Sequence, residues 1–160
     1  MSLREIGMNK RHLQKIILFF APLALAVVGC SDRWKEPKVV INEICSCNFS
    51  AGKDANGRYS DCVELYNPGK SDISLDGCFL TDDEKEPEKY SLEGLMVPAG
   101  GYALVWLDQN AALRISRDGD RLFLTDSEEG VFLDQVIVPR LDHDTSYGRM
   151  ARSSYSGFAS

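Results

Sequence analysis

Hydrophobic residues follow one pattern near the N-terminus of this chain and a different one in the rest of it. Residues 16–28 form an apolar run of 13 residues, interrupted only by Pro22, and a basic stretch at residues 10–15 directly precedes it. A membrane-spanning helix needs about 20 apolar residues, so this run is too short to cross a bilayer as a stable helix. A basic segment followed by a short apolar run is typical of a secretory signal peptide.

A cysteine closes this N-terminal segment. The run ends in Val27-Val28-Gly29-Cys30, with a small residue directly before the cysteine. This ending resembles the lipobox of bacterial lipoproteins, in which the cysteine is lipidated and becomes the new N-terminus. The resemblance implies a lipoprotein signal peptide at residues 1–29 and lipidation of Cys30. The polar residues that follow, up to residue 38, then form a short tether, so that residues 30–38 comprise the lipidated cysteine and the tether. The implied location is the bacterial cell envelope, outside the cytoplasm and anchored to a membrane by the lipid.

From residue 39 onward, the hydrophobic residues occur in short segments separated by turn residues. Residues 62–66 alternate between apolar and polar side chains, a period of two that predicts a half-buried strand. The turn residues Asn67-Pro68-Gly69 follow directly, and a second turn is expected at residues 98–101. We expect further strands at residues 39–44, 73–80, 90–97, 102–106, 121–125, 131–138 and 146–149, and at most one helical turn, at residues 110–115.

The number and spacing of these strands predict an all-β fold. Seven or eight short strands without a long helix are typical of a β-sandwich or a barrel, and the pattern alone does not choose between them. Residues 102–106 are the most apolar segment and are expected to form a central strand. Residues 39–149 span a length close to the ~100 residues of an immunoglobulin-like sandwich.

Five segments of the chain lie in order at residues 40–44, 59–69, 73–83, 97–102 and 146–149. Together they resemble segments of bacterial lamin tail domains. That resemblance implies an immunoglobulin-like β-sandwich, preceded here by a signal peptide, and a non-catalytic adhesion, tethering or binding module rather than an enzyme. The tail at residues 150–160 is Ser-rich and lacks the family's Pro-rich closing segment, which predicts a truncated gene, a shifted reading frame or a fragment of a longer protein.

The combination of a lipoprotein signal with this domain resembles the N-terminal part of CotH-type surface proteins. It implies a lipid-anchored binding or tethering module of the cell envelope whose partner is an unidentified protein or glycan. The alternative is a detached N-terminal accessory domain of a longer CotH-type kinase-like or nuclease protein. Reading the genomic sequence downstream of residue 160 in all frames separates the two hypotheses.

The charge of the chain disfavours nucleic acid as a partner. Removal of residues 1–29 takes away Arg4, Lys10, Arg11 and Lys15 but only one acid, Glu5, and so moves the net charge from −6 to −9. A chain this acidic repels the phosphates that a nucleic-acid-binding protein must neutralise. The composition is otherwise that of a folded domain, with 44% hydrophobic and 26% charged residues.

Four cysteines remain after Cys30, and an even number in an exported chain permits disulfides. Cys45 and Cys47 are two apart on one strand, about 6.5–7 Å between Cα atoms, at the edge of disulfide geometry. A hairpin centred on Lys70 sets Cys62 opposite Cys78, which makes this pair the candidate disulfide, with free thiols packed as small hydrophobes as the equal alternative. Zinc is disfavoured because Cys45-x-Cys47 is tighter than the usual spacing of zinc ligands.

The sequence holds one weak metal motif and no convincing catalytic one. Asp54, Asn56 and Asp61 faintly resemble a calcium loop, but the positions that should supply further ligands are wrong, and an Asx-rich turn is the preferred interpretation. His143, the only histidine after Cys30, lies between two aspartates and is expected in a solvated loop. Glu64 is expected to face away from the core in an architectural role. We therefore predict no enzymatic activity, no cofactor and no metal.

Overall fold

The computed structural model describes residues 38–107, 112–150 and 157–159, so the predicted signal peptide and Cys30 lie outside the described residues. The chain divides into two units, residues 1–32 and 33–160, and the strands belong to the second. The described residues contain no helix, and therefore none that is long and apolar enough to cross a membrane.

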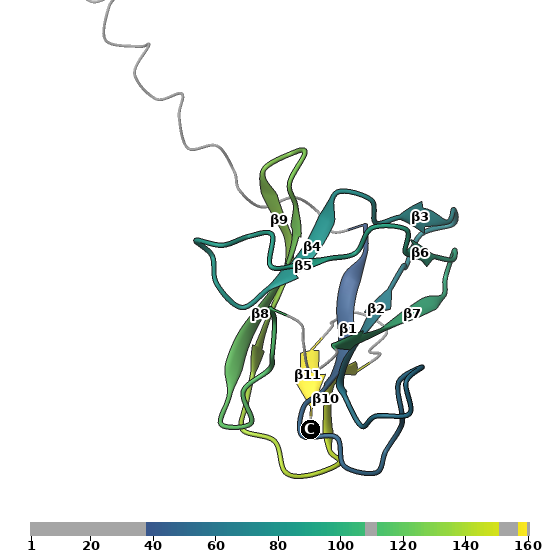
Figure 1. The fold of residues 1–160 in the computed structure, drawn as a ribbon. Helices are drawn as coiled ribbons and strands as arrows, with labels where there is room; N and C mark the ends of the chain where they lie inside the picture. The colour runs from purple at the N-terminus through teal and green to yellow at the C-terminus, as the bar shows by residue number, and fades with distance from the viewer. Residues whose placement is uncertain (1–37, 108–111, 151–156, 160) are drawn as a thin grey trace, which may run out of the picture. The chain divides into compact units, whose positions relative to one another are not determined.

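The prediction of an all-β fold is confirmed (Figure 1). The strands are β1 (Val40–Cys45), β2 (Asp61–Tyr66), β3 (Ile73–Ser74), β4 (Cys78–Thr81), β5 (Tyr90–Ser91), β6 (Met96–Val97), β7 (Tyr102–Leu107), β8 (Asp120–Asp126), β9 (Val131–Val138), β10 (Ser146–Met150) and β11 (Gly157–Ala159).

Two antiparallel sheets form a sandwich around one core, as expected for an immunoglobulin-like fold. The first sheet has the strand order β11-β10-β1-β2-β7, and the second has the order β5-β4-β8-β9, while β3 and β6 pair in a separate two-stranded ribbon. Apolar side chains from both sheets meet between them and exclude water, which is the main stabilising contribution to such a fold. This core contains Ile41, Ile44, Val63, Leu65, Val105 and Leu107 from the first sheet and Cys78, Leu80, Leu122, Leu124, Val136 and Val138 from the second.

The alternation of residues 62–66 predicts the two faces of β2 correctly. Val63 and Leu65 are completely buried in the core, whereas Glu64 lies on the opposite face of the first sheet. In β1, the pairing with β2 shifts between Ile41 and Glu43, and this β-bulge allows Ile41 and Ile44 both to enter the core.

The predicted strand at residues 73–80 is wrong as a single element. The chain turns at residues 75–77, where Gly77 adopts a φ of 75° that L side chains rarely allow and the Cys78 N–H donates to the Leu75 carbonyl at 3.0 Å. As a result, β3 pairs with β6, while β4 joins the second sheet. The expected hairpin between residues 62–67 and 73–79 therefore does not form.

The most apolar strand, β7, is not central. Among the described strands it pairs with β2 alone, and it lies at the edge of the first sheet. Tyr102 and Leu104 are 54% and 48% exposed, so the apolar side chains of β7 occupy both faces of an edge strand. The helical turn expected at residues 110–115 is also wrong where the structure describes it, because residues 112–115 are not helical, with Leu113 and Ile115 buried.

An ion pair joins the two sheets at one edge of the sandwich. Arg149 on β10 donates two hydrogen bonds to the Asp134 carboxylate on β9, at 2.8 and 2.7 Å. The same two side chains bind the backbone of Ile41 at the bulge, since its N–H donates to Asp134 at 2.7 Å and its carbonyl accepts from Arg149 at 2.8 Å. The pair thus provides hydrogen-bond partners for both backbone groups of Ile41, which lies beyond the residues of β1 that pair with β10.

The outer faces of the two sheets differ. On the second sheet, the acidic loop at residues 82–89 is held by buried hydroxyl groups, because Thr81 donates to the Glu86 carbonyl and Thr125 donates to the Pro87 carbonyl, each at 2.7 Å. Nearby, the ring of Phe123 is buried outside the main core. On the first sheet, the outer face of β1, β2 and β7 carries exposed apolar side chains and a pocket.

Candidate functional site

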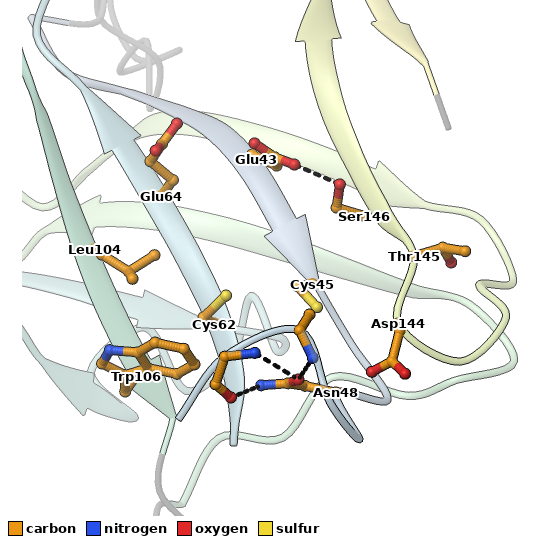
Figure 2. Close-up of a pocket in the computed structure, with 12 residues that line it drawn as sticks. Glu43, Cys45, Asn48, Cys62, Glu64, Leu104, Trp106, Asp144, Thr145 and Ser146 are labelled. Carbon is orange, nitrogen blue, oxygen red and sulfur yellow. Dashed lines mark hydrogen bonds between the residues drawn. The ribbon is translucent and has the colours of Figure 1, made fainter. Parts of the chain in front are cut away.

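The outer face of β1, β2, β7 and β10 carries two rows of side chains that the strand registers place side by side. In the first row, Ser146, Cys45, Cys62 and Trp106 are successive partners across β10, β1, β2 and β7. In the second row, Gly148, Glu43, Glu64 and Leu104 are partners in the same strand order. Apart from Gly148, the residues of these rows line a cavity of about 350 Å³, and Figure 2 shows their side chains on its floor.

The loop at residues 46–60 forms one wall of this pocket. Asn48 is buried and organises the loop, since its side-chain amide donates to the carbonyls of Gly52 and Ser60 at 2.7 and 2.9 Å, and its oxygen accepts from the Ala51 N–H at 3.1 Å (Figure 2). Gly52 lies against the indole of Trp106, where a Cβ atom would come within 3.1 Å of the ring. A side chain at position 52 would therefore require the Trp106 ring to move by a few tenths of an ångström.

A second loop, which leads into β10, forms the adjoining part of the wall. Asp144 precedes β10 and adopts a φ of 55°, and its carboxylate accepts the N–H groups of Phe49 and Ser50 at 2.6 and 2.7 Å. These N–H groups hold the pKa of Asp144 below its ordinary value. The ring of the neighbouring His143 packs edge-on against Phe49, with 4.4 Å between centroids. Asp144 thus pins the loop at residues 46–60 to the start of β10.

The pocket is acidic and has an aromatic extension. Glu43 accepts a hydrogen bond from the Ser146 hydroxyl, and Glu64 accepts one from the Asn42 side chain at 2.7 Å. Beyond Leu104, the rings of Tyr66 and Tyr102 stack with 4.7 Å between centroids. Carboxylates beside exposed apolar surface suit a neutral or cationic partner that offers hydrogen-bond donors, and they repel polyanions.

The structure separates the cysteines that the sequence had paired. Cys62 lies on β2 in the first sheet, whereas Cys78 lies on β4 in the second sheet and packs in the core, so the register that placed them opposite each other is wrong. Burial raises the pKa of Cys78 to about 11, which keeps it a neutral thiol. The direct partner of Cys62 on β1 is Cys45, and all four described cysteines are free thiols.

The two carboxylates of the weak calcium motif, Asp54 and Asp61, already accept hydrogen bonds within the loop. One carboxylate oxygen of Asp54 accepts the N–H groups of Asn56 and Arg58, at 2.8 and 2.9 Å, and the other accepts the Ser60 hydroxyl at 2.8 Å. Asp61 accepts the Cys47 N–H at 2.9 Å. This is the geometry of an Asx-turn. Among the residues that the structure describes, no group of three His, Cys, Asp or Glu is placed to hold a metal ion.

The decisive comparison is with protein families. The family model of the lamin tail domain matches residues 35–139. The chain belongs to the lamin tail domain family. This domain is in general a non-catalytic, immunoglobulin-like β-sandwich, in agreement with the sheets above. A search of curated proteins finds no match.

The lamin tail domain match covers β1 to β9, and the pocket extends beyond it. Asp144, Thr145 and Ser146 line the pocket but follow the matched residues. Sequence reasoning gave these residues, Cys45 and Trp106 no role as a binding site. The sequence did contain a local indication of the role of Trp106, because residues 102–107 are apolar at every position. A strand with apolar side chains on both faces exposes some of them when it lies at the edge of a sheet.

Proposed function

We propose that this lamin tail domain is a non-catalytic, lipid-anchored module of the bacterial cell envelope that binds a partner through the outer face of β1, β2 and β7. The observation that carries the binding role is the open, partly apolar outer face of the first sheet. Its floor is shaped by two registered rows of side chains, and its walls are two loops pinned together through Asp144. Apolar side chains that are exposed to solvent do not stabilise the fold, and a patch of them on a monomer usually marks a binding surface.

The chemistry of this face indicates the class of partner. Trp106, Leu104 and the stacked pair Tyr66–Tyr102 offer apolar and aromatic contact area, and Glu43 and Glu64 accept hydrogen bonds. Both a protein surface and a glycan provide the matching donors and apolar faces, and a polyanion does not. Saturable binding of the protein to isolated envelopes tests the role. Loss of binding after protease treatment of the envelopes identifies a protein partner, and loss after glycan hydrolysis identifies a glycan.

The anchoring role rests on the N-terminal segment, whose short apolar run ends in Gly29-Cys30. We expect the wild-type protein to incorporate labelled palmitate and to sediment with membranes, and the Cys30→Ala variant to lose the label and most of the membrane association, because one or more acyl chains supply the affinity for the bilayer. The Cys47→Ser variant is the matched control and keeps both properties. A Cys30→Ala protein that stays fully membrane-bound contradicts the anchor.

The alternative is that this chain is a detached N-terminal accessory domain of a longer CotH-type kinase-like or nuclease protein. It stays a prediction that the downstream genomic sequence tests.

A further inference from the structure

Two thiols meet on the floor of the pocket, and neither the fold nor the proposed binding role requires them. Cys45 is the last residue of β1, Cys62 is the second residue of β2, and the two are direct partners in the antiparallel register. Both line the pocket, and Figure 2 shows their side chains on adjacent strands in the same cavity. The other two described cysteines are placed differently, since Cys78 lies in the core between the sheets and Cys47 lies beyond the end of β1.

Directly opposed positions of an antiparallel pair meet the geometric requirement of a disulfide. Their Cα atoms are about 4.5 or 5.5 Å apart, depending on the hydrogen-bonding pattern, and disulfides span about 4.4–6.8 Å. Both side chains project from the same face of the sheet into the same pocket, so the two thiols are neighbours on adjacent strands. Sulfur–sulfur bond formation at this position needs side-chain rotation but no change in strand pairing.

We propose that Cys45 and Cys62 form a reversible cross-strand disulfide on the floor of the pocket, made by exchange with a disulfide oxidant of the cell envelope. The Cys45 thiolate attacks one sulfur of the oxidant R–S–S–R, which gives a mixed disulfide and releases one RS⁻. The Cys62 thiolate then attacks the Cys45 sulfur, closes the bond and releases the second RS⁻. The two thiol protons end on the two RS⁻ groups, so the products are one protein disulfide and two RSH.

The surroundings of the two thiols differ. The neighbouring Cys62 side chain lowers the pKa of Cys45, whereas the neighbouring Cys45 side chain and burial raise the pKa of Cys62. These directions favour Cys45 as the first nucleophile and Cys62 as the resolving thiol, and the same disulfide results in either order. Cys78 does not compete, since burial keeps it protonated. Because both thiols border the pocket, oxidant enters and RSH leaves through its opening.

The bond would act on the pocket directly. Cys45 and Cys62 flank the loop at residues 46–60, which forms one pocket wall, so a disulfide between them closes this loop at its base. It also replaces two polar hydrogens next to Trp106 and Ser146 with an apolar S–S surface. Oxidation thereby fixes one wall of the cavity and makes its floor less polar.

Peptide mapping of the full chain tests the proposal. The folded protein is incubated with oxidised glutathione, remaining thiols are alkylated under denaturing conditions, and a non-reduced tryptic digest is analysed by mass spectrometry. Cleavage after Lys38, Lys53, Arg58 and Lys70 places Cys45 and Cys47 in the peptide at residues 39–53 and Cys62 in the peptide at residues 59–70, with Cys30 and Cys78 in others. We expect residues 39–53 linked to residues 59–70, and separation of the two by dithiothreitol.

Matched variants assign the bond to one cysteine of the first peptide. Cys45→Ser and Cys62→Ser should each abolish the linked species, whereas Cys47→Ser, which removes a thiol from the same peptide, should keep it. Circular dichroism shows whether each variant is folded. If Cys45→Ser does not fold, the linked peptides of the wild-type protein and the Cys62→Ser variant still test the proposal. Absence of the linked peptides in the wild type, persistence in folded Cys45→Ser, or linkage through the Cys78 peptide overturns the proposal.

Discussion

Replacing Asp134 with alanine is expected to lower the free energy of unfolding by about 3–5 kcal/mol, since it removes one partner of a largely buried ion pair together with the hydrogen bonds that this carboxylate accepts. The side chains of Asp134 and Arg149 are only 11% and 17% exposed. The substitution also leaves the N–H of Ile41 at the bulge without its acceptor, so three donor–acceptor contacts between β9 and the first sheet are lost together. Urea denaturation followed by circular dichroism measures the effect.

An exposed ion pair on the same protein provides the control for Asp134→Ala. Glu84 and Arg121 are joined at 2.9 Å, but their side chains are about half exposed, so water screens their attraction. Glu84→Ala should therefore change the free energy of unfolding by about 0–1 kcal/mol. If Asp134→Ala were as mild as Glu84→Ala, the ion pair would not hold the two sheets together as described.

Asn67→Ala is expected to cost about 2–4 kcal/mol, because Asn67 is completely buried and its side chain serves three backbone groups. Its amide donates to the carbonyls of Ser71 and Val97 at 2.8 and 3.1 Å, and its oxygen accepts the Gly69 N–H at 2.8 Å. Alanine leaves these groups without that partner at the end of β2 and beside β6. The midpoint of thermal unfolding should fall correspondingly.

The matched control is another asparagine in a turn. Asn56 is exposed, and only its backbone N–H takes part in the turn built by Asp54. Asn56→Ala should change stability by less than about 0.5 kcal/mol. An equal, small effect of both substitutions would mean that Asn67 is dispensable for the turn that follows β2.

Local patterns predicted most strands of this fold but not their partners. Residues 131–138 form β9 as expected, and residues 62–66 form most of β2, because alternation and turn residues are properties of neighbouring positions. The segment at residues 73–80 contains a turn at Asp76-Gly77 that separates β3 from β4. The predicted hairpin between residues 62–67 and 73–79 ignores this turn, and the predicted pairing of Cys62 with Cys78 fails with it. Pairing between distant strands has no comparable local signal.

The pocket was less predictable than the fold for the same reason. Glu43 and Ser146 are hydrogen-bonded although they are 103 residues apart, and no short motif announces such a contact. The outward direction of Glu64 followed from strand periodicity, yet its neighbours Leu104 and Glu43 depend on two separate registers. The apolar character of residues 102–106 predicts a central strand, although it marks an exposed face at the sheet edge.

Quantitative binding of two lysine variants to isolated envelopes tests the central claim that the outer face of β1, β2 and β7 is the binding surface. Leu104 lies on this face and Ile137 lies on β9 of the other sheet, and they are 48% and 65% exposed, so lysine is tolerated at both positions. Measured in a Cys30→Ala background to remove the lipid, Leu104→Lys should weaken saturable binding by about tenfold or more. Ile137→Lys should leave it unchanged. Undiminished binding of Leu104→Lys, or an equal loss in Ile137→Lys, would contradict the account.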